Sequence, residues 1–153
     1  MLSLNNNLID RYIHIIYPPE LEIKDTTDTS YSASYLDIFL EYDSKGNLST
    51  KLYDKRDDFS FPIVNFPFMS SNIPQSPAYG VFVSQLIRYA RACTEYTDFL
   101  ERGKLLCSKL LTQGFVKSKL VTSLKKFYGR HHNLVSGYCV SVSQLVREMF
   151  FDT

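Results

Sequence analysis

Hydrophobic residues recur at helical spacing near the start of the chain and throughout its second half. Residues 8–16 place Leu8, Tyr12 and Ile16 on one face, and the pair Pro18-Pro19 ends this predicted helix because proline cannot continue one. The same spacing predicts helices over about residues 77–89, 95–113, 116–129 and 141–150. The second half of the chain is therefore predicted to be a helical bundle.

Capping signals mark several ends of these predicted helices. The pair Ser76-Pro77 is typical of an N-cap followed by proline at the first helical position. Gly114 is placed to end the second helix of the bundle, since glycine readily adopts the left-handed backbone of a helix C-terminus. Ser141 and Gln144 have the spacing of a capping box, which predicts the start of the last helix.

Alternating polar and apolar residues predict a β-hairpin in the first half of the chain. Residues 36–42 and 48–53 alternate at strand period, and the polar stretch 43–47 between them has turn chemistry. Residues 21–24 predict a short strand before the hairpin, and residues 25–30 predict a polar loop. One face of the hairpin is largely apolar, so we expect it to pack against another part of the protein.

A segment rich in proline and phenylalanine, residues 59–76, joins the two halves. We expect an ordered, irregular connection because so many aromatic rings need burial. The predicted fold class is α+β, with a short helix and an antiparallel hairpin over residues 1–58 and a helical region over residues 77–153. The chain of 153 residues has the size of one domain, which is large enough to bury a core.

The net charge of +1 conceals an uneven distribution of charge. Residues 1–76 carry a net charge of −5, and residues 77–153 carry a net charge of +6. From Arg102 to Arg147 there are nine Lys and Arg residues and no acidic residue. A stretch of this kind indicates a polyanionic partner, and a solvated basic surface that binds nothing is the alternative.

The densest part of this basic stretch lies on the predicted 116–129 helix. Its predicted hydrophobic stripe is Val116, Leu120, Leu124 and Phe127. Lysine and arginine neutralise phosphates, and a tyrosine ring packs on sugar or base. The sequence therefore predicts nucleic-acid contacts here. The predicted contact residues are Lys117, Lys119, Lys125, Lys126, Tyr128 and Arg130.

The carboxylates of the chain give weak signals for catalysis. The pair Asp57-Asp58 follows two basic residues and lacks the aromatic-x pattern of a polymerase hairpin, so we favour a solvated or salt-bridged loop over an Mg²⁺ site. Asp37 is a lone strand carboxylate, for which a catalytic role is the minor alternative. Neither a nucleophile elbow nor a glycine-rich phosphate loop occurs in the sequence. We therefore expect no enzymatic activity from this chain.

Histidines and cysteines predict neither a metal centre nor a disulfide. The pair His131-His132 precedes Cys139, but no second spaced pair completes a zinc pattern. The three cysteines, Cys93, Cys107 and Cys139, include no CxxC pair and are typical of reduced thiols. No apolar run approaches the roughly 20 residues that span a bilayer, and the N-terminus does not resemble a signal peptide. We expect an intracellular protein of the cytoplasm or nucleus.

Several long runs of the sequence resemble reverse transcriptases (RNA-directed DNA polymerases) of animal retroelements. These runs are residues 17–27, 33–37, 50–59, 61–68, 71–74, 77–81, 84–92, 113–115 and 126–130. They are spread over essentially the whole chain. In such proteins, the segment that resembles residues 2–6 directly follows the aromatic-x-Asp-Asp hairpin of the polymerase palm. The resemblance thus implies that this chain lies downstream of the catalytic aspartates and is a non-catalytic C-terminal fragment.

The same resemblance implies roles for the regions of this chain. Residues 21–53 would be the end of a palm-like subdomain, and the helices after Pro77 would be a thumb-like bundle that grips a template–primer duplex of RNA and DNA. Mg²⁺ is expected only in the complete polymerase, whose remainder would be a partner. An incomplete palm sheet has an unpaired edge, so we expect modest stability and non-specific self-association. One alternative is a self-standing nucleic-acid-binding module built from the thumb-like half, and another is a structural or protein-interaction module that docks through the apolar hairpin face.

Overall fold

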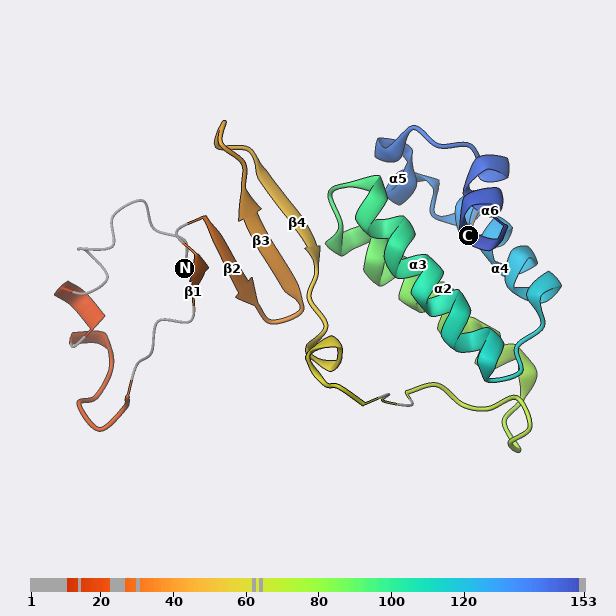
Figure 1. The fold of residues 1–153 in the computed structure, drawn as a ribbon, viewed down its shortest axis with the longest axis horizontal. Coiled ribbons are helices and arrows are strands. Elements are labelled where there is room, and N and C mark those ends of the chain that lie inside the picture. Colours follow the sequence, from red (N-terminus) through yellow and green to blue (C-terminus); the bar gives the residue numbers. More distant parts are fainter. Residues whose placement is uncertain are drawn as a thin grey trace.

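The computed structural model describes residues 11–13, 15–22, 27–29, 31–61, 63 and 65–151 (Figure 1). Its four strands form an antiparallel sheet in sequential order. The strands are β1 (Thr27–Thr29), β2 (Ser32–Tyr35), β3 (Ile38–Tyr42) and β4 (Leu48–Leu52). The helices are η1 (Lys55–Asp58), α2 (Gln75–Ala92), α3 (Tyr96–Thr112), α4 (Lys117–Arg130), α5 (His132–Val135), η2 (Ser136–Tyr138) and α6 (Val142–Phe150). The predicted α+β class is confirmed.

The β3–β4 hairpin forms where the alternation predicts it. Asp43 organises the turn, because its Oδ1 accepts hydrogen bonds from the backbone N–H groups of Lys45 and Asn47, each at 2.8 Å. A hydrogen bond from the Asn47 side chain makes the largest contribution to lowering the pKa of the Asp43 carboxyl, and the backbone bonds lower it further. Gly46 has φ +80°, a conformation in which other residues are strained.

The start of the sheet differs from the prediction. Thr27–Thr29 forms strand β1, within the segment predicted as a loop, because β-branched threonines fit a strand despite their polarity. Leu36 and Asp37 form a turn between β2 and β3 instead of beginning a strand, and Leu36 has φ +54°. Residues 21–22 are not in a strand, and residues 23–24 lie outside the described part. Of the predicted first helix, residues 11–13 and 15–16 are helical, and the other positions are not described.

The sheet is attached to the helices through the outer edge of β4. The Thr94 N–H, in the α2–α3 connection, donates to the Thr50 carbonyl at 2.8 Å, and the Thr50 hydroxyl donates to the Ala92 carbonyl at 2.8 Å. Arg102 of α3 donates to the Leu52 carbonyl at 3.2 Å. Leu52 is buried between sheet and helices. Helical residues therefore cover this edge of the sheet (Figure 1).

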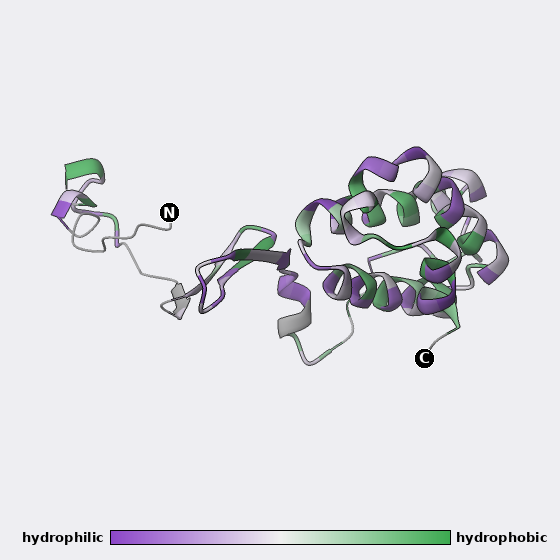
Figure 2. Ribbon diagram, turned by 90° about the horizontal axis from the view of Figure 1, so that it is seen from above, coloured by the Kyte–Doolittle hydropathy of each residue, from purple (hydrophilic) through white to green (hydrophobic). Residues whose placement is uncertain are grey.

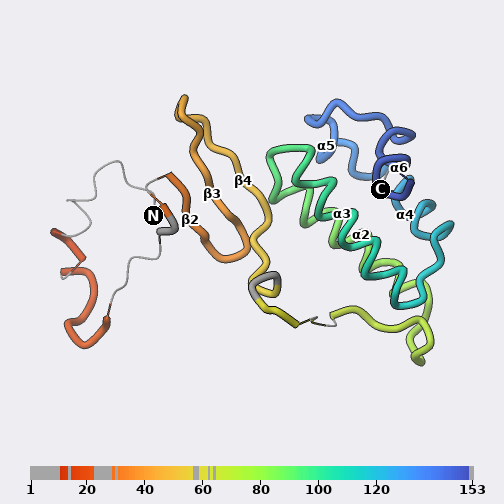
Figure 3. Tube along the Cα trace, in the orientation of Figure 1, coloured from red at the N-terminus to blue at the C-terminus, as the bar shows by residue number. Residues whose placement is uncertain are grey.

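Helix α2 runs toward the sheet, and α3 returns beside it, so that the turn between them meets β4 (Figures 1 and 3). Helices α4 and α6 pack against this pair. Hydrophobic and hydrophilic positions alternate around the bundle helices, as amphipathic helices require (Figure 2). The largest fully buried side chains are Phe82, Phe99, Phe127, Leu86, Leu106, Leu110, Leu120, Leu124, Leu145 and Val135. The hydrophobic core thus lies within the helical bundle.

The structure confirms the predicted capping residues at two of three helix ends. Gly114 follows α3 with φ +86°, and the Ser141 side chain accepts the Gln144 N–H at the start of α6. The predicted start of α2 is wrong. Pro74 is its N-cap, and Pro77 lies inside the first turn, where a missing N–H breaks no helical bond.

The connection between β4 and α2 passes along one side of the bundle (Figure 3). Phe66 and Met69 pack against the core, and the Met69 N–H donates to the carbonyl of Gln113 at 2.9 Å. Three other rings are about half exposed, which corrects the expectation that the aromatics of this segment are buried. These rings are Phe59, Phe61 and Phe68.

Candidate nucleic-acid interface

Helix α4 carries the predicted contact residues and is fixed by one buried stripe. Leu120, Leu124 and Phe127 are fully buried, at intervals of four and three residues that keep them on one face. Val116 does not belong to this stripe: it is the N-cap residue, and half of its surface is exposed. The stripe holds α4 against the bundle, and the five predicted basic residues of the helix are exposed.

The basic residues of α4 lie on two sides of the helix. An α-helix has 3.6 residues per turn, so the intervals of seven and four residues place Lys119, Lys126 and Arg130 in one line. We call these three residues the basic row. Lys117 and Lys125 lie on the opposite flank of the buried stripe by the same geometry. All five cations are exposed, and the row is their longest single line of charge.

The charges of the basic row are not neutralised by carboxylates. Helix α4 contains no acidic residue, and among the described residues none of its five cations forms an ion pair. Lys119 Nζ donates to Gln75 Oε1 at 2.8 Å and lies 5.7 Å from the centre of the Tyr79 ring. Both partners are neutral, so the positive charge of Lys119 remains available to an anion.

The other flank of α4 is partly occupied by contacts within the protein. Lys117 Nζ lies 3.9 Å from the centre of the Phe151 ring, a cation–π contact just after α6. The Tyr128 hydroxyl donates to the Val140 carbonyl at 2.8 Å, and its ring packs edge-on against His132. Tyr128 is half-buried and therefore holds the bundle together. Its hydroxyl and its ring thus make contacts within the bundle, and its contact with a nucleic acid stays a prediction.

Asp37, His131 and His132 each contact another side chain in the described part of the chain. Arg88 Nη2 donates to Asp37 Oδ2 at 2.7 Å, so this carboxylate forms an ion pair between the sheet and α2. His131 packs near Phe127, whereas the neighbouring His132 packs on Tyr128. Within the described part of the chain, no three His, Cys, Asp or Glu residues are grouped as metal ligands.

The pair Asp57-Asp58 ends the short helix η1, and its side chains lie outside the described residues. The carboxylate that organises this helix is Asp54. Arg56 Nε and Nη2 donate to its two oxygens at 2.7 and 2.6 Å, and these bonds lower the pKa of the Asp54 carboxyl. This local ion pair fixes the chain just before the connection.

The three cysteines have different surroundings. Cys93 and Cys107 are buried, and burial raises the pKa of both thiols, that of Cys107 to about 12. Cys139 is exposed. Nucleophilic reactivity requires the thiolate, so the two buried thiols are expected to be inert in the folded protein.

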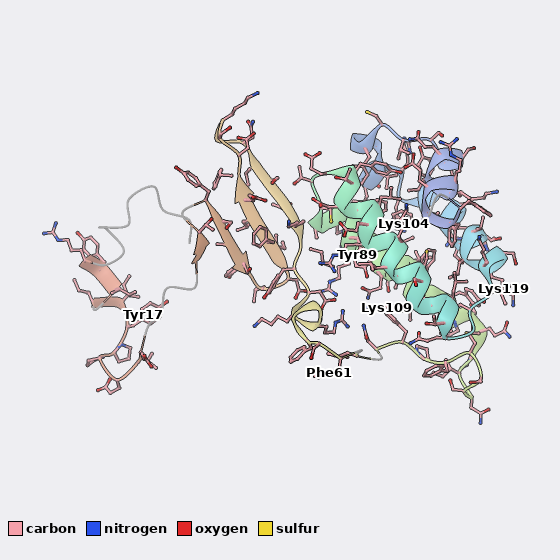
Figure 4. The ribbon with its side chains drawn as sticks, viewed as in Figure 1. Tyr17, Phe61, Tyr89, Lys104, Lys109 and Lys119 are labelled. Carbon is pink, nitrogen blue, oxygen red and sulfur yellow. The ribbon has the colours of Figure 1, made fainter. Side chains whose placement is uncertain are left out.

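One feature of the surface was not predicted from the sequence. A cavity of about 420 Å³ lies between the connection and the C-terminal end of α3, and Phe61 and Lys109 are among the residues that line it (Figure 4). These two residues are 48 positions apart, and no spacing rule links them. The aromatic residues of the connection are the feature of the sequence that could have indicated this cavity. We expected them to be buried, so the cavity was not predicted.

Comparisons with known proteins leave the chain without an assigned family. No protein-family model matches it, and neither a curated protein nor a solved structure is significantly similar to it. Among the described residues, no helix has the length and apolar character needed to cross a membrane.

Proposed function

We propose that this chain binds a template–primer duplex of RNA and DNA through the basic row of α4, as the thumb-like C-terminal part of a retroelement reverse transcriptase. The observation that carries the proposal is the line Lys119, Lys126 and Arg130 on a helix without acidic residues. A rigid line of cations beside a fixed hydrophobic stripe suits the regular phosphate backbone of a duplex. The role is binding, without a catalytic centre of its own.

The length of the row suits several phosphates of one duplex. Lys119 and Arg130 are 11 positions apart, which corresponds to about 16 Å along a helix that rises 1.5 Å per residue. Duplex DNA carries one phosphate charge per roughly 1.7 Å of its axis, counting both strands. Three exposed cations over this length can each meet a different phosphate. Such contacts fix position and carry no base sequence information.

The exposed apolar surface of the N-terminal half supports a protein partner in addition to the duplex. In the part of the chain that the structure describes, 17 large hydrophobic residues are exposed, and thirteen of them lie between Tyr12 and Ile73, outside the helical bundle. They include Tyr35 and Leu48 on the sheet, at 63% and 45% exposure. Apolar surface of this kind is typical of an interaction site. In our proposal, the remainder of the polymerase covers it, and Mg²⁺ is bound there and not by this chain.

The alternative function is a structural or protein-interaction module that has no nucleic-acid role. The same exposed surface favours it, and duplex binding separates the two. Under our proposal, the full chain binds a fluorescently labelled RNA–DNA duplex, and log Kd rises with log salt concentration by about 0.7 to 0.9 for each phosphate contact. Fluorescence anisotropy titrations at several salt concentrations between 50 and 200 mM measure this slope. The absence of binding at 50 mM salt would reject the nucleic-acid role and leave the interaction module.

A further inference from the structure

The cavity beside the C-terminal end of α3 has the dimensions of a small-molecule site. Its volume of about 420 Å³ lies within the usual range of roughly 300 to 1,000 Å³ for ligand pockets. The connection forms one wall and α3 the other, with Phe61 and Lys109 on the two sides (Figure 4). Among the described residues, the basic row of α4 contributes nothing to its lining.

The connection contributes an aromatic wall. Phe59 and Phe61 are 53% and 59% exposed, and their ring centres lie 5.3 Å apart with planes at 44°. Phenyl rings left in water gain stabilisation when a flat apolar surface covers them. A nucleobase has such a surface, and stacking of a base on an aromatic side chain contributes about 1–3 kcal/mol.

Helix α3 contributes a positive charge. Lys109 is exposed, and among the described residues it has no carboxylate partner. Arg56 also lines the cavity, but the bidentate pair with Asp54 compensates its charge. The cavity therefore presents one uncompensated cation, which suits a single phosphate group.

Gln113 contributes a polar group at the end of α3. The residue lines the cavity and is 8% exposed, and its buried Oε1 has no hydrogen-bond partner in the described structure. A buried acceptor without a donor is unfavourable. A ligand N–H group that donates to this oxygen would remove that cost, which requires the side-chain amide to rotate toward the cavity.

We propose that this cavity binds a nucleotide, with the base against Phe59 and Phe61, the phosphate on Lys109, and a base N–H donating to Gln113 Oε1. The combination of an aromatic wall, one free cation and an unpaired acceptor matches a nucleoside monophosphate better than it matches phosphate or an aromatic compound alone. The proposal goes beyond duplex binding by the basic row and does not depend on it.

Isothermal titration calorimetry of the full chain with adenosine 5′-monophosphate tests the proposal. Adenosine and ribose 5-phosphate each carry one half of the ligand, so each is expected to bind more weakly than the nucleotide. Phe61→Leu and Lys109→Gln are each expected to raise Kd at least about fivefold, since each removes one recognition element. Both side chains are exposed, so these variants are expected to fold.

Matched controls use residues of the same types outside the cavity. Phe68→Leu changes a half-exposed ring of the same connection, and Lys45→Gln changes an exposed cation in the β3–β4 turn. Neither is expected to change Kd more than twofold. Equal losses in the controls, binding of ribose 5-phosphate as tight as that of the nucleotide, or no binding at millimolar concentration would overturn the proposal. Replacing the basic row tests duplex binding separately, because it leaves this cavity intact.

Discussion

Phe99→Ala is expected to lower the free energy of unfolding by about 3–5 kcal/mol, the usual loss for a fully buried phenylalanine. Phe99 has no exposed surface and lies between two other rings. Its ring centre is 5.3 Å from that of Tyr138 and 6.5 Å from that of Phe127, with both pairs stacked. The substitution removes these contacts and leaves a cavity where α3, α4 and η2 meet. Urea denaturation followed by circular dichroism measures the loss.

The size of this effect matters because domains are stable by only about 5–15 kcal/mol in total. A matched control is Leu105→Ala on the same helix, where the side chain is 46% exposed. We expect it to cost less than about 1 kcal/mol, as surface substitutions do. Similar losses for both variants would mean that the ring cluster around Phe99 does not organise the bundle.

The second large effect is expected from removing the basic row. The triple variant Lys119→Gln, Lys126→Gln and Arg130→Gln should lower the slope of log Kd against log salt by about two to three, because three phosphate contacts disappear. Wild-type affinity then falls roughly 20- to 40-fold more than that of the variant between 50 and 200 mM salt. Anisotropy titrations with the labelled RNA–DNA duplex measure both slopes.

A charge-matched control separates a specific row from general attraction to a basic protein. Lys45, Lys51 and Lys55 lie on the hairpin and η1, and their replacement by glutamine also removes three positive charges. This variant should keep the slope of the wild-type chain. If both triple variants change the slope equally, binding is diffuse, and the assignment to α4 is wrong.

The parts of the fold that were predicted correctly depend on short-range signals. The burial of Leu120, Leu124 and Phe127 follows from spacing within one helix, and the position of Gly114 follows from backbone sterics. The turn at Asp43 likewise uses residues only two to four positions apart. In each case, the residues that determine the local structure are close to one another in the sequence.

The errors occur where distant parts of the chain decide the outcome. Thr27–Thr29 pairs with β2, so partner strands override its loop-like composition. The Tyr128 hydroxyl donates to the Val140 carbonyl, 12 positions away, and no sequence pattern predicted this bond. Short helix α5 carries no periodic pattern and was not predicted. Tertiary contacts of this kind produce no periodic pattern in the sequence.

The sequence was likewise sufficient to predict one part of the candidate surface features and not the other. The positions of Lys119, Lys126 and Arg130 on one line follow from helical geometry alone, so the sequence was sufficient to predict it. The cavity beside α3 required the connection to fold back on Lys109, and only the structure brings these residues together.

Site-directed cross-linking tests most directly whether the basic row contacts a duplex. Thr122 is exposed and lies on the same side of α4 as the basic row, three positions after Lys119 and four before Lys126. Thr122→Cys in a Cys139→Ser background presents a single exposed cysteine for a photo-activated cross-linker, since Cys93 and Cys107 are buried. Thr97→Cys, exposed on α3 next to Asp98, is the matched control.

We expect the probe at Thr122 to cross-link to the labelled RNA–DNA duplex at low salt, with a yield that falls as salt is raised. We expect little cross-linking from position 97, where the neighbouring carboxylate repels phosphate. Equal yields from the two positions, or a higher yield from position 97, would contradict a duplex interface on α4.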